Sequence, residues 1–211
     1  FSLILLQGVI GWYMVKSGLV NDITVSHYRL SIHLSTAILI ISIVFWLIKN
    51  ITSNKNKVFF KFSKNNFPFQ ILIFIIFIQI ILGAFVSGLD AGKIYQTWPL
   101  MGNTYIPDDL LYENVISIFQ FDNHSLVQFY HRNLAYLIIL YTFGLSIFIY
   151  RKRTFNLHKP LKILLFVLFI QVLLGIITLV SGLNIYLASM HQITSVLLVF
   201  SALNLYYFNA K

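Results

Sequence analysis

The sequence predicts an all-α polytopic membrane protein with six transmembrane helices. Its composition supports this class, because 58% of the residues are hydrophobic and only 10% are charged, while the mean hydropathy is +0.82. These values lie outside the range of soluble domains. Apolar runs of about 20 residues, long enough to cross a bilayer, recur along the chain. The predicted spans are residues 1–19, 30–48, 67–89, 125–150, 161–183 and 185–208.

Charged residues divide unequally between the two sides of the predicted bundle. Of the 15 basic residues, the four on one side are Lys16, Arg29, Lys93 and Arg132. All six acidic residues lie on that same side: Asp22, Asp90, Asp108, Asp109, Glu113 and Asp122. The other basic residues fill the alternate connections and the chain end: Lys49, Lys55, Lys57, Lys61, Lys64, Arg151, Lys152, Arg153, Lys159, Lys162 and Lys211.

This distribution follows the positive-inside pattern, so the basic connections are predicted to face the cytoplasm. Anionic lipid headgroups are a sufficient partner for the net charge of +9, and we expect no nucleic-acid partner. The first span begins without an initiator methionine or a basic leader, so we do not expect it to be a signal peptide. We expect the chain to be a fragment that starts inside a helix of a longer protein.

Three histidines are predicted to lie at the same depth in three helices that run inward from the outer face. They are His33, His131 and His191, each a turn or two into its span. Hydrocarbon offers an imidazole no hydrogen-bond partner, so each ring must find one within the protein. Several imidazoles at one level of a helix bundle are what an axially ligated haem requires. A hydrogen bond between helices explains any single histidine equally well, but three at matched depth favour the haem interpretation.

The remaining histidines are weaker candidates. His27 is predicted in an outer connection and His158 in a basic cytoplasmic loop, where a solvated side chain is the default. His124 precedes His131 by seven residues and can share its helical face, but we expect it at or above the membrane surface.

An internal repeat links the histidine-bearing helices. The first, third and fifth spans each carry a glutamine, a glycine four residues later and then a Ser-Gly-Leu sequence, and each precedes a helix with one of the three histidines. The glutamine and glycine pairs are Gln7 and Gly11, Gln79 and Gly83, and Gln171 and Gly175. We interpret the glycines as packing positions that allow close helix contact, and the repeat as a duplicated four-helix architecture.

The repeat predicts two units. Residues 67–211 are predicted to form a complete carboxyl-terminal four-helix unit with an outer loop at residues 90–124. Residues 1–66 match the back half of such a unit. A complete protein would then have a further helical hairpin before Phe1, with a histidine to pair with His33.

Ordered motifs along the chain resemble haem A synthase of the proteobacterial and mitochondrial type. They are GWYMVKSGL at residues 11–19, YRLSIH at 28–33, GAFVSGLDAG at 83–92, WPLMG at 98–102, QFYHR at 128–132 and MHQ at 190–192. The resemblance covers essentially the whole chain, and the ordered series is far more specific than any one motif.

The resemblance implies an eight-helix oxidoreductase made of two four-helix halves. Such an enzyme oxidises the C8 methyl of haem O to the formyl group of haem A for cytochrome c oxidase assembly. Its carboxyl-terminal half holds a haem b cofactor between two histidines, which correspond to His131 and His191. Its amino-terminal half takes up the substrate haem near two histidines, one of which corresponds to His33. The other, and an acidic residue with a catalytic role, would precede residue 1, so the fragment alone is expected to bind haem b but make no haem A.

The resemblance also implies partners and a location. Dioxygen, an unidentified electron donor, haem O synthase and cytochrome oxidase assembly factors are the expected partners besides haem O and membrane lipid. The expected location is the bacterial inner membrane rather than the mitochondrial inner membrane, with the histidine sites toward the outer face.

Arginines and a long loop at the outer side are further candidates. Arg29 and Arg132 lie near His33 and His131 and are suited to pair with haem propionates, although anchoring at the interface explains them equally well. The loop at residues 90–124 is long enough to be a functional cover. Its aromatic residues can close over a haem edge or hold the loop at the interface: Tyr95, Trp98, Tyr105 and Phe121.

Two other functions remain open at this point. A bis-histidine membrane cytochrome that only transfers electrons would need the same four-helix unit without a substrate site, and the duplicated segment around His33 argues against it. A transporter or assembly factor without a cofactor would use the histidines for proton relay or packing.

Overall fold

The computed structural model describes residues 1–18, 25–111 and 118–210, which form helices and loops without a β-strand in these ranges. Asp22 and Glu113, which the sequence places on the outer side, lie outside the described residues. The long helices are α1 (Ser2–Gly18), α2 (His27–Thr52), α3 (Phe67–Gly88), α5 (His124–Arg151), α6 (His158–Val180) and α7 (Ile185–Asn209). The short ones are η1 (Ala91–Lys93), α4 (Asp108–Leu111) and η3 (Phe155–Leu157).

The helices confirm an all-α polytopic membrane protein. Among the described residues, five helices are long and apolar enough to cross a membrane: α2, α3, α5, α6 with its preceding turn, and α7. The first predicted span, residues 1–19, corresponds to α1, which is apolar but shorter, with 17 residues.

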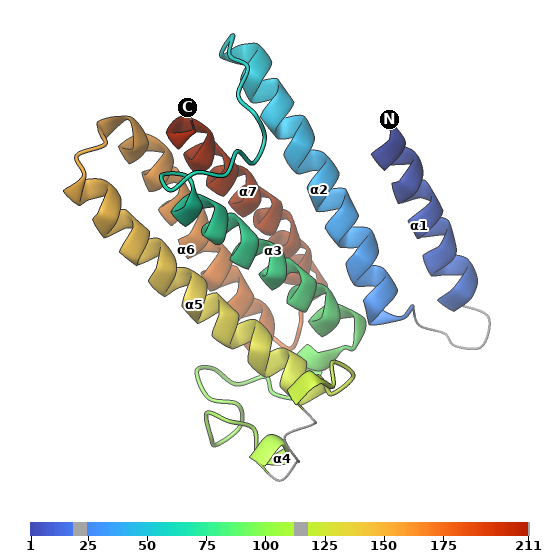
Figure 1. Cartoon of the computed structure of the whole chain (residues 1–211). Helices are drawn as coiled ribbons and strands as arrows, with labels where there is room; N and C mark the ends of the chain where they lie inside the picture. The colour runs from blue at the N-terminus through green and yellow to red at the C-terminus, as the bar shows by residue number, and fades with distance from the viewer. Residues whose placement is uncertain (19–24, 112–117, 211) are drawn as a thin grey trace.

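Four helices close into a bundle, and the other two long helices lie beside it. Helix α3 packs against α5, α5 against α6, α6 against α7, and α7 returns to α3. Helix α2 packs on α3 and α7, while α1 packs on α2 at the edge of the molecule (Figure 1). In the four-helix ring α5 and α7 are therefore diagonal to each other, and both can present side chains to its interior.

Asparagine caps set the starting points of the two diagonal helices. The side chain of Asn123 accepts a hydrogen bond from the backbone N–H of Leu126 at the start of α5. Asn184 accepts from the backbone N–H groups of Tyr186 and Leu187 at the start of α7. Capping of this kind satisfies N–H groups that the first turn leaves free. It fixes where each helix begins and so the depth of the side chains that follow.

The bundle is most tightly packed at the end that holds the two chain termini in Figure 1. There Trp46, Leu161, Leu203 and Tyr206 are each at most 2% exposed and belong to one apolar core. Burial of such side chains is worth roughly 1.5–3 kcal/mol each, which anchors this end of the bundle. A smaller cluster of buried residues lies near the opposite end, beneath the loop that contains α4.

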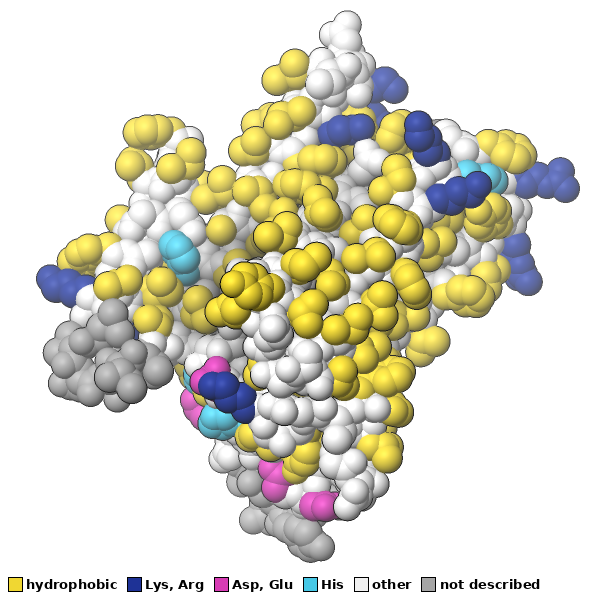
Figure 2. Space-filling model, turned by 180° about the vertical axis from the view of Figure 1, so that it is seen from behind, with side chains coloured by type: hydrophobic (Ala, Val, Ile, Leu, Met, Phe, Trp, Pro, Cys, Tyr) yellow, Lys and Arg dark blue, Asp and Glu magenta, His cyan; other side chains and the backbone are white. Residues whose placement is uncertain are grey.

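Charge separates along the helix axes as the sequence predicts. Figure 2 shows most of the visible Lys and Arg side chains at the upper end and the Asp and Glu side chains near the lower end, with apolar side chains between them. The connection between α2 and α3 and the connection between α5 and α6 both lie at the basic end (Figure 1).

Candidate functional site

Each of the three histidines faces a glutamine and a glycine of the helix before it. His33 on α2 faces α1, His131 on α5 faces α3, and His191 on α7 faces α6. The glutamine and glycine are four residues apart and therefore share one helical face. The sequence repeat thus corresponds to a repeated contact in space.

The glutamine amides lie against the imidazole nitrogens. Gln79 Nε2 is 3.4 Å from His131 Nε2 and donates to the His131 backbone carbonyl at 2.9 Å. Gln171 Nε2 is likewise 3.4 Å from His191 Nε2. Gln7 Nε2 is 3.2 Å from Nδ1 and 3.3 Å from Nε2 of His33, and donates to its carbonyl at 3.0 Å.

The glycines make room for the rings. A Cβ atom at Gly11 or Gly175 would lie 2.9 Å from Cε1 of the facing histidine, and one at Gly83 would lie 3.2 Å from Cε1 of His131. Any larger residue would displace the imidazole. The glycines are therefore packing positions, as predicted, but the group that approaches them is a histidine ring and not only a helix backbone.

His131 and His191 are brought together, whereas His33 lies on a helix outside the ring. The first two project from diagonal helices about two turns from each helix start. His191 Nδ1 lies 3.1 Å from the backbone carbonyl of Gln171. That contact favours the tautomer with hydrogen on Nδ1 and the lone pair on Nε2, beside the Gln171 amide nitrogen.

Packing around this pair differs from packing at the basic end. Along α7 the buried residues begin at Leu198, and the residues before it are half-buried or exposed. On α5 the residues between Gln128 and Ile138 are likewise half-buried or exposed. The helix turns that carry both imidazoles are therefore less buried than the turns at the basic end.

Arg132, the residue after His131, binds the outer loop. Its Nη2 donates to the carbonyl of Tyr95 at 2.7 Å, and its Nη1 donates to the carbonyls of Thr97 at 2.8 Å and Leu100 at 3.3 Å. Its Nε is buried without a hydrogen-bond partner among the described residues. Arg29, the other predicted candidate, lies over the ring of Tyr13 at 5.5 Å, within the range of a cation–π contact.

Two aromatic residues of the outer loop are held by polar contacts. Tyr95 donates to Asp109 at 3.0 Å, and burial, followed by the contact with Asp109, raises the pKa of its hydroxyl. Tyr105 donates to Asn133 on α5. The hydrogen bond of Tyr95 joins two parts of the loop, and the hydrogen bond of Tyr105 joins the loop to α5.

The other two aromatic residues of the loop, Phe121 and Trp98, differ in burial. Phe121 packs against Phe85 and Tyr130 near the ends of α3 and α5. Trp98 is 46% exposed. Of these two, Phe121 alone therefore lies within the packed part of the molecule.

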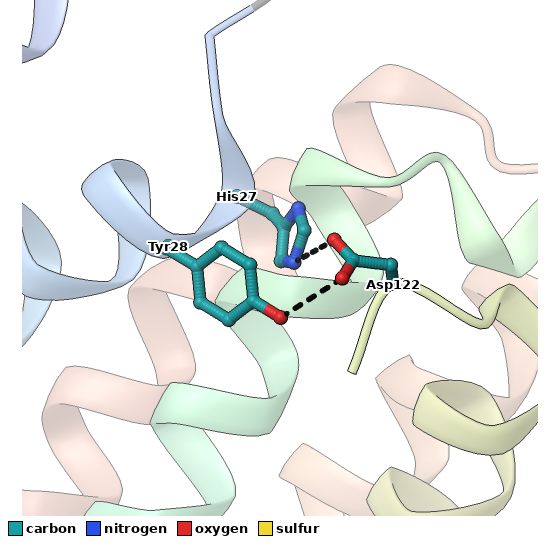
Figure 3. A network of polar contacts seen from close by, with 3 residues as sticks. All are labelled: His27, Tyr28 and Asp122. Carbon is teal, nitrogen blue, oxygen red and sulfur yellow. Dashed lines mark hydrogen bonds and ion pairs between the residues drawn. The ribbon is translucent and has the colours of Figure 1, made fainter. Parts of the chain in front are cut away.

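The prediction that the His27 side chain is solvated is wrong. His27 was predicted to be solvated in an outer connection, but it is the first residue of α2 and is buried. Its Nε2 lies 3.5 Å from Asp122, which also accepts a hydrogen bond from Tyr28 at 3.3 Å (Figure 3). Its Cα and Cβ lie directly over Gly88, where a Cβ would come within 2.7 Å. The close fit at this glycine explains why His27 is excluded from water.

The other weak candidates remain apart from the paired histidines. His124 is the exposed first residue of α5, as expected. His158 begins α6 at the basic end and is half-buried against Tyr150, with 4.5 Å between the ring centroids, so it is less solvated than predicted.

The geometry defines a class of protein: a helical membrane protein whose four-helix bundle carries one histidine on each of two diagonal helices, about two turns from the start of each helix. Residues 1–203 match the family COX15-CtaA, described as cytochrome oxidase assembly protein. The chain belongs to this family.

Three similar proteins are each named heme A synthase. The chain is 45% identical to the heme A synthase of Pelagibacter ubique (strain HTCC1062) over 214 residues, covering 100% of the chain and 61% of the relative. It is 39% identical to the heme A synthase of Wolbachia pipientis subsp. Culex pipiens, covering 94% of the chain and 58% of the relative. It is 37% identical to that of Rickettsia africae, covering 92% and 58%. The chain thus spans about three fifths of the length of these curated relatives.

Proposed function

We propose that the protein acts as a haem A synthase, an oxidoreductase that converts the C8 methyl of haem O to the formyl group of haem A for cytochrome c oxidase assembly. The observation that carries the proposal is the pair His131 and His191, which project from diagonal helices at matched depth in a member of this family. The relatives named heme A synthase support the same reaction.

In this proposal His131 and His191 are the axial ligands of a haem b cofactor. The donor set fits the group, because the contact of His191 Nδ1 with the Gln171 carbonyl favours the tautomer whose lone pair is on Nε2. Haem iron at Nε2 would take the place of the glutamine amide that lies 3.4 Å from this atom in both His131 and His191. Bound haem supplies one-electron transfer when two imidazoles fill both axial positions.

We assign the substrate side to residues 1–66 and the cofactor unit to residues 67–211. His33 repeats the glutamine and glycine contacts of the other two histidines, so it is proposed to bind the substrate haem. With dioxygen as oxidant and a separate electron donor, the reaction balances as one methyl group, two dioxygen molecules, four electrons and four protons giving one formyl group and three waters. The electron donor, haem O synthase and the assembly factors are proposed partners of this reaction.

Arg132 is proposed to contact a haem propionate. A guanidinium has five N–H donors, and the three loop carbonyls leave its buried Nε–H for a further acceptor. Arg29 is proposed for the same role beside His33, from its place over Tyr13. In this arrangement the histidine end faces the outer side of the bacterial inner membrane and the basic end faces the cytoplasm.

Haem extraction tests the proposal. The protein is purified from cells that make haem O, and its haems are identified by the pyridine haemochrome spectrum and by chromatography. Haem b together with haem O or haem A is expected. Haem b alone would instead indicate a cytochrome that only transfers electrons, and a colourless protein from haem-replete cells would contradict both haem functions.

A further inference from the structure

A cavity lies at the basic end of the molecule, away from the paired histidines. Its volume of about 670 Å³ is within the range of small-ligand sites. Three segments that are distant in sequence line it: the α2–α3 connection, the turn that contains η3, and the end of α7. Its polar side chains are those of Lys55, Asn56, Lys57, Thr154, Asn156 and Asn209.

The segments around the cavity carry positive charge without an acidic residue. Residues 23–89 and 123–211 contain no Asp or Glu, and every residue that lines the cavity lies within these two ranges. Burial, followed by the charge of Lys55, lowers the pKa of the Lys57 ammonium. The two lysines therefore repel each other, and an anion beside both of them would offset this repulsion.

Hydrogen bonds hold the Lys57 ammonium in place beside the cavity. Its Nζ donates to the backbone carbonyl of Tyr207 at 2.8 Å and to that of Ala210, and it lies 4.8 Å from the centroid of the Tyr207 ring. These contacts offset the negative end of the α7 dipole, which would otherwise disfavour an anion here. An ammonium has three N–H donors, so the two carbonyls leave one for a ligand.

Exposed aromatic side chains border the cavity. Phe208 lines it and is 43% exposed, and Phe155, next to the lining residue Thr154, is 73% exposed. Lys49 adds a further positive charge, with Nζ 4.9 Å from the Phe208 ring. In the proposed orientation this end lies at the level of the cytoplasmic lipid headgroups. A phospholipid offers both an anionic phosphate and apolar chains to such a surface, whereas a free phosphate ion offers only the first.

We propose that this cavity binds the phosphate of an anionic phospholipid between Lys55 and Lys57. The acyl chains lie against Phe155 and Phe208. A lipid bound in this way contacts the α2–α3 connection and the end of α7 together, and it therefore stabilises their packing. The site is separate from the histidines and does not depend on the proposed haem function.

A count of bound lipids tests the proposal. The purified protein in a non-ionic detergent is titrated with short-chain phosphatidylglycerol, and native mass spectrometry gives the fraction of protein with one lipid bound. Lys55 is the residue to replace, because it is exposed and its loss should not unfold the protein. A lysine near an anionic headgroup contributes about 5-fold in affinity, so Lys55→Gln should bind the lipid about 5-fold more weakly. Lys55→Arg keeps the charge and should bind the lipid as the parent does.

Lys64→Gln is the matched control. Lys64 is exposed on the same connection but does not line the cavity, so its replacement removes the same charge from the same end and should leave the affinity unchanged. Short-chain phosphatidylcholine, whose headgroup has no net charge, should bind more weakly than phosphatidylglycerol. Inorganic phosphate at an equal concentration should not displace the bound lipid.

Equal weakening in the Lys55→Gln and Lys64→Gln proteins would overturn the proposed site, because the net charge of this end alone would then attract the lipid. Equal binding of the two lipids would overturn it as well. Displacement by an equal concentration of inorganic phosphate would replace the lipid assignment with a site for a free anion. The measurement needs no haem, so its outcome is independent of the test of the proposed function.

Discussion

Arg132 donates a hydrogen bond across 2.7 Å to the backbone carbonyl of Tyr95, so the residue that follows His131 also holds the outer loop. Gln128, one turn earlier on α5, donates to the same carbonyl at 2.8 Å. A displacement of this loop would therefore also displace the helix turn that carries His131. The loop is thus linked to the turn of the proposed cofactor ligand by Arg132 and Gln128.

Replacement of Arg132 by lysine should loosen the loop. Lysine has a single ammonium group, which cannot reproduce a planar fork directed at three carbonyls. Since hydrogen bonds to charged groups are worth about 1.5–3 kcal/mol, loss of one should increase local opening by about 10-fold or more. Hydrogen exchange of the backbone amides between Tyr95 and Leu100 measures this. Arg29→Lys, on α2 outside the four-helix ring, is the control and should leave these amides unchanged.

Single histidine variants should separate the cofactor site from the substrate side. His131→Ala or His191→Ala should abolish the low-spin haem bands in the visible spectrum, because each removes one axial ligand. His33→Ala should leave those bands largely in place, since α2 lies outside the four-helix ring. Loss of the bands in the His33 variant alone would show that the cofactor draws a ligand from residues 1–66.

The sequence predicts the helices and the matched depth of the three histidines because both depend on local patterns. Apolar runs determine the spans, and the place of each histidine within its run determines its depth. The pairing of each histidine with the preceding helix could also have been anticipated. Gln79 and Gly83 are four residues apart and so share the face on which His131 rests.

Other features depend on packing between distant segments and leave no local pattern. His27 is buried because Gly88, on another helix, leaves room for its Cα and Cβ. Arg132 contacts three backbone carbonyls of a loop, and a main-chain carbonyl has no side-chain signature in the sequence. The sequence identified Arg132 as a candidate for anion binding but not as an anchor of the loop.

Replacement of a glycine by alanine should lower the haem content only where the new Cβ would collide with a histidine ring. Gly175→Ala would bring a Cβ to 2.9 Å from His191 Cε1, so the ring must move and haem content should fall. A Cβ at Gly144 on α5 would meet no atom of another element within 4 Å, so Gly144→Ala is the control. It should keep the parent haem content and gain about 0.5–1 kcal/mol in helix stability. Haem-to-protein absorbance ratios and thermal unfolding in detergent measure both effects. Equal haem loss in the two variants would mean that the ring contact at Gly175 is unimportant.

The contact between α2 and the four-helix ring should depend more on Gly88 than on Asp122. Asp122 has a side chain 76% exposed, and its ion pair with His27 spans 3.5 Å. A long contact with one solvent-exposed partner contributes about 0–1 kcal/mol, so Asp122→Asn should change the free energy of unfolding little. Gly88→Ala would place a Cβ within 2.8 Å of the His27 backbone, which cannot rotate away as a side chain can. Overpacking of this type costs about 1–3 kcal/mol.

Thermal unfolding of both variants in the same detergent should therefore show the larger loss of stability for Gly88→Ala. The reverse order would mean that the polar contacts in Figure 3, and not the close helix approach, hold α2 against α3.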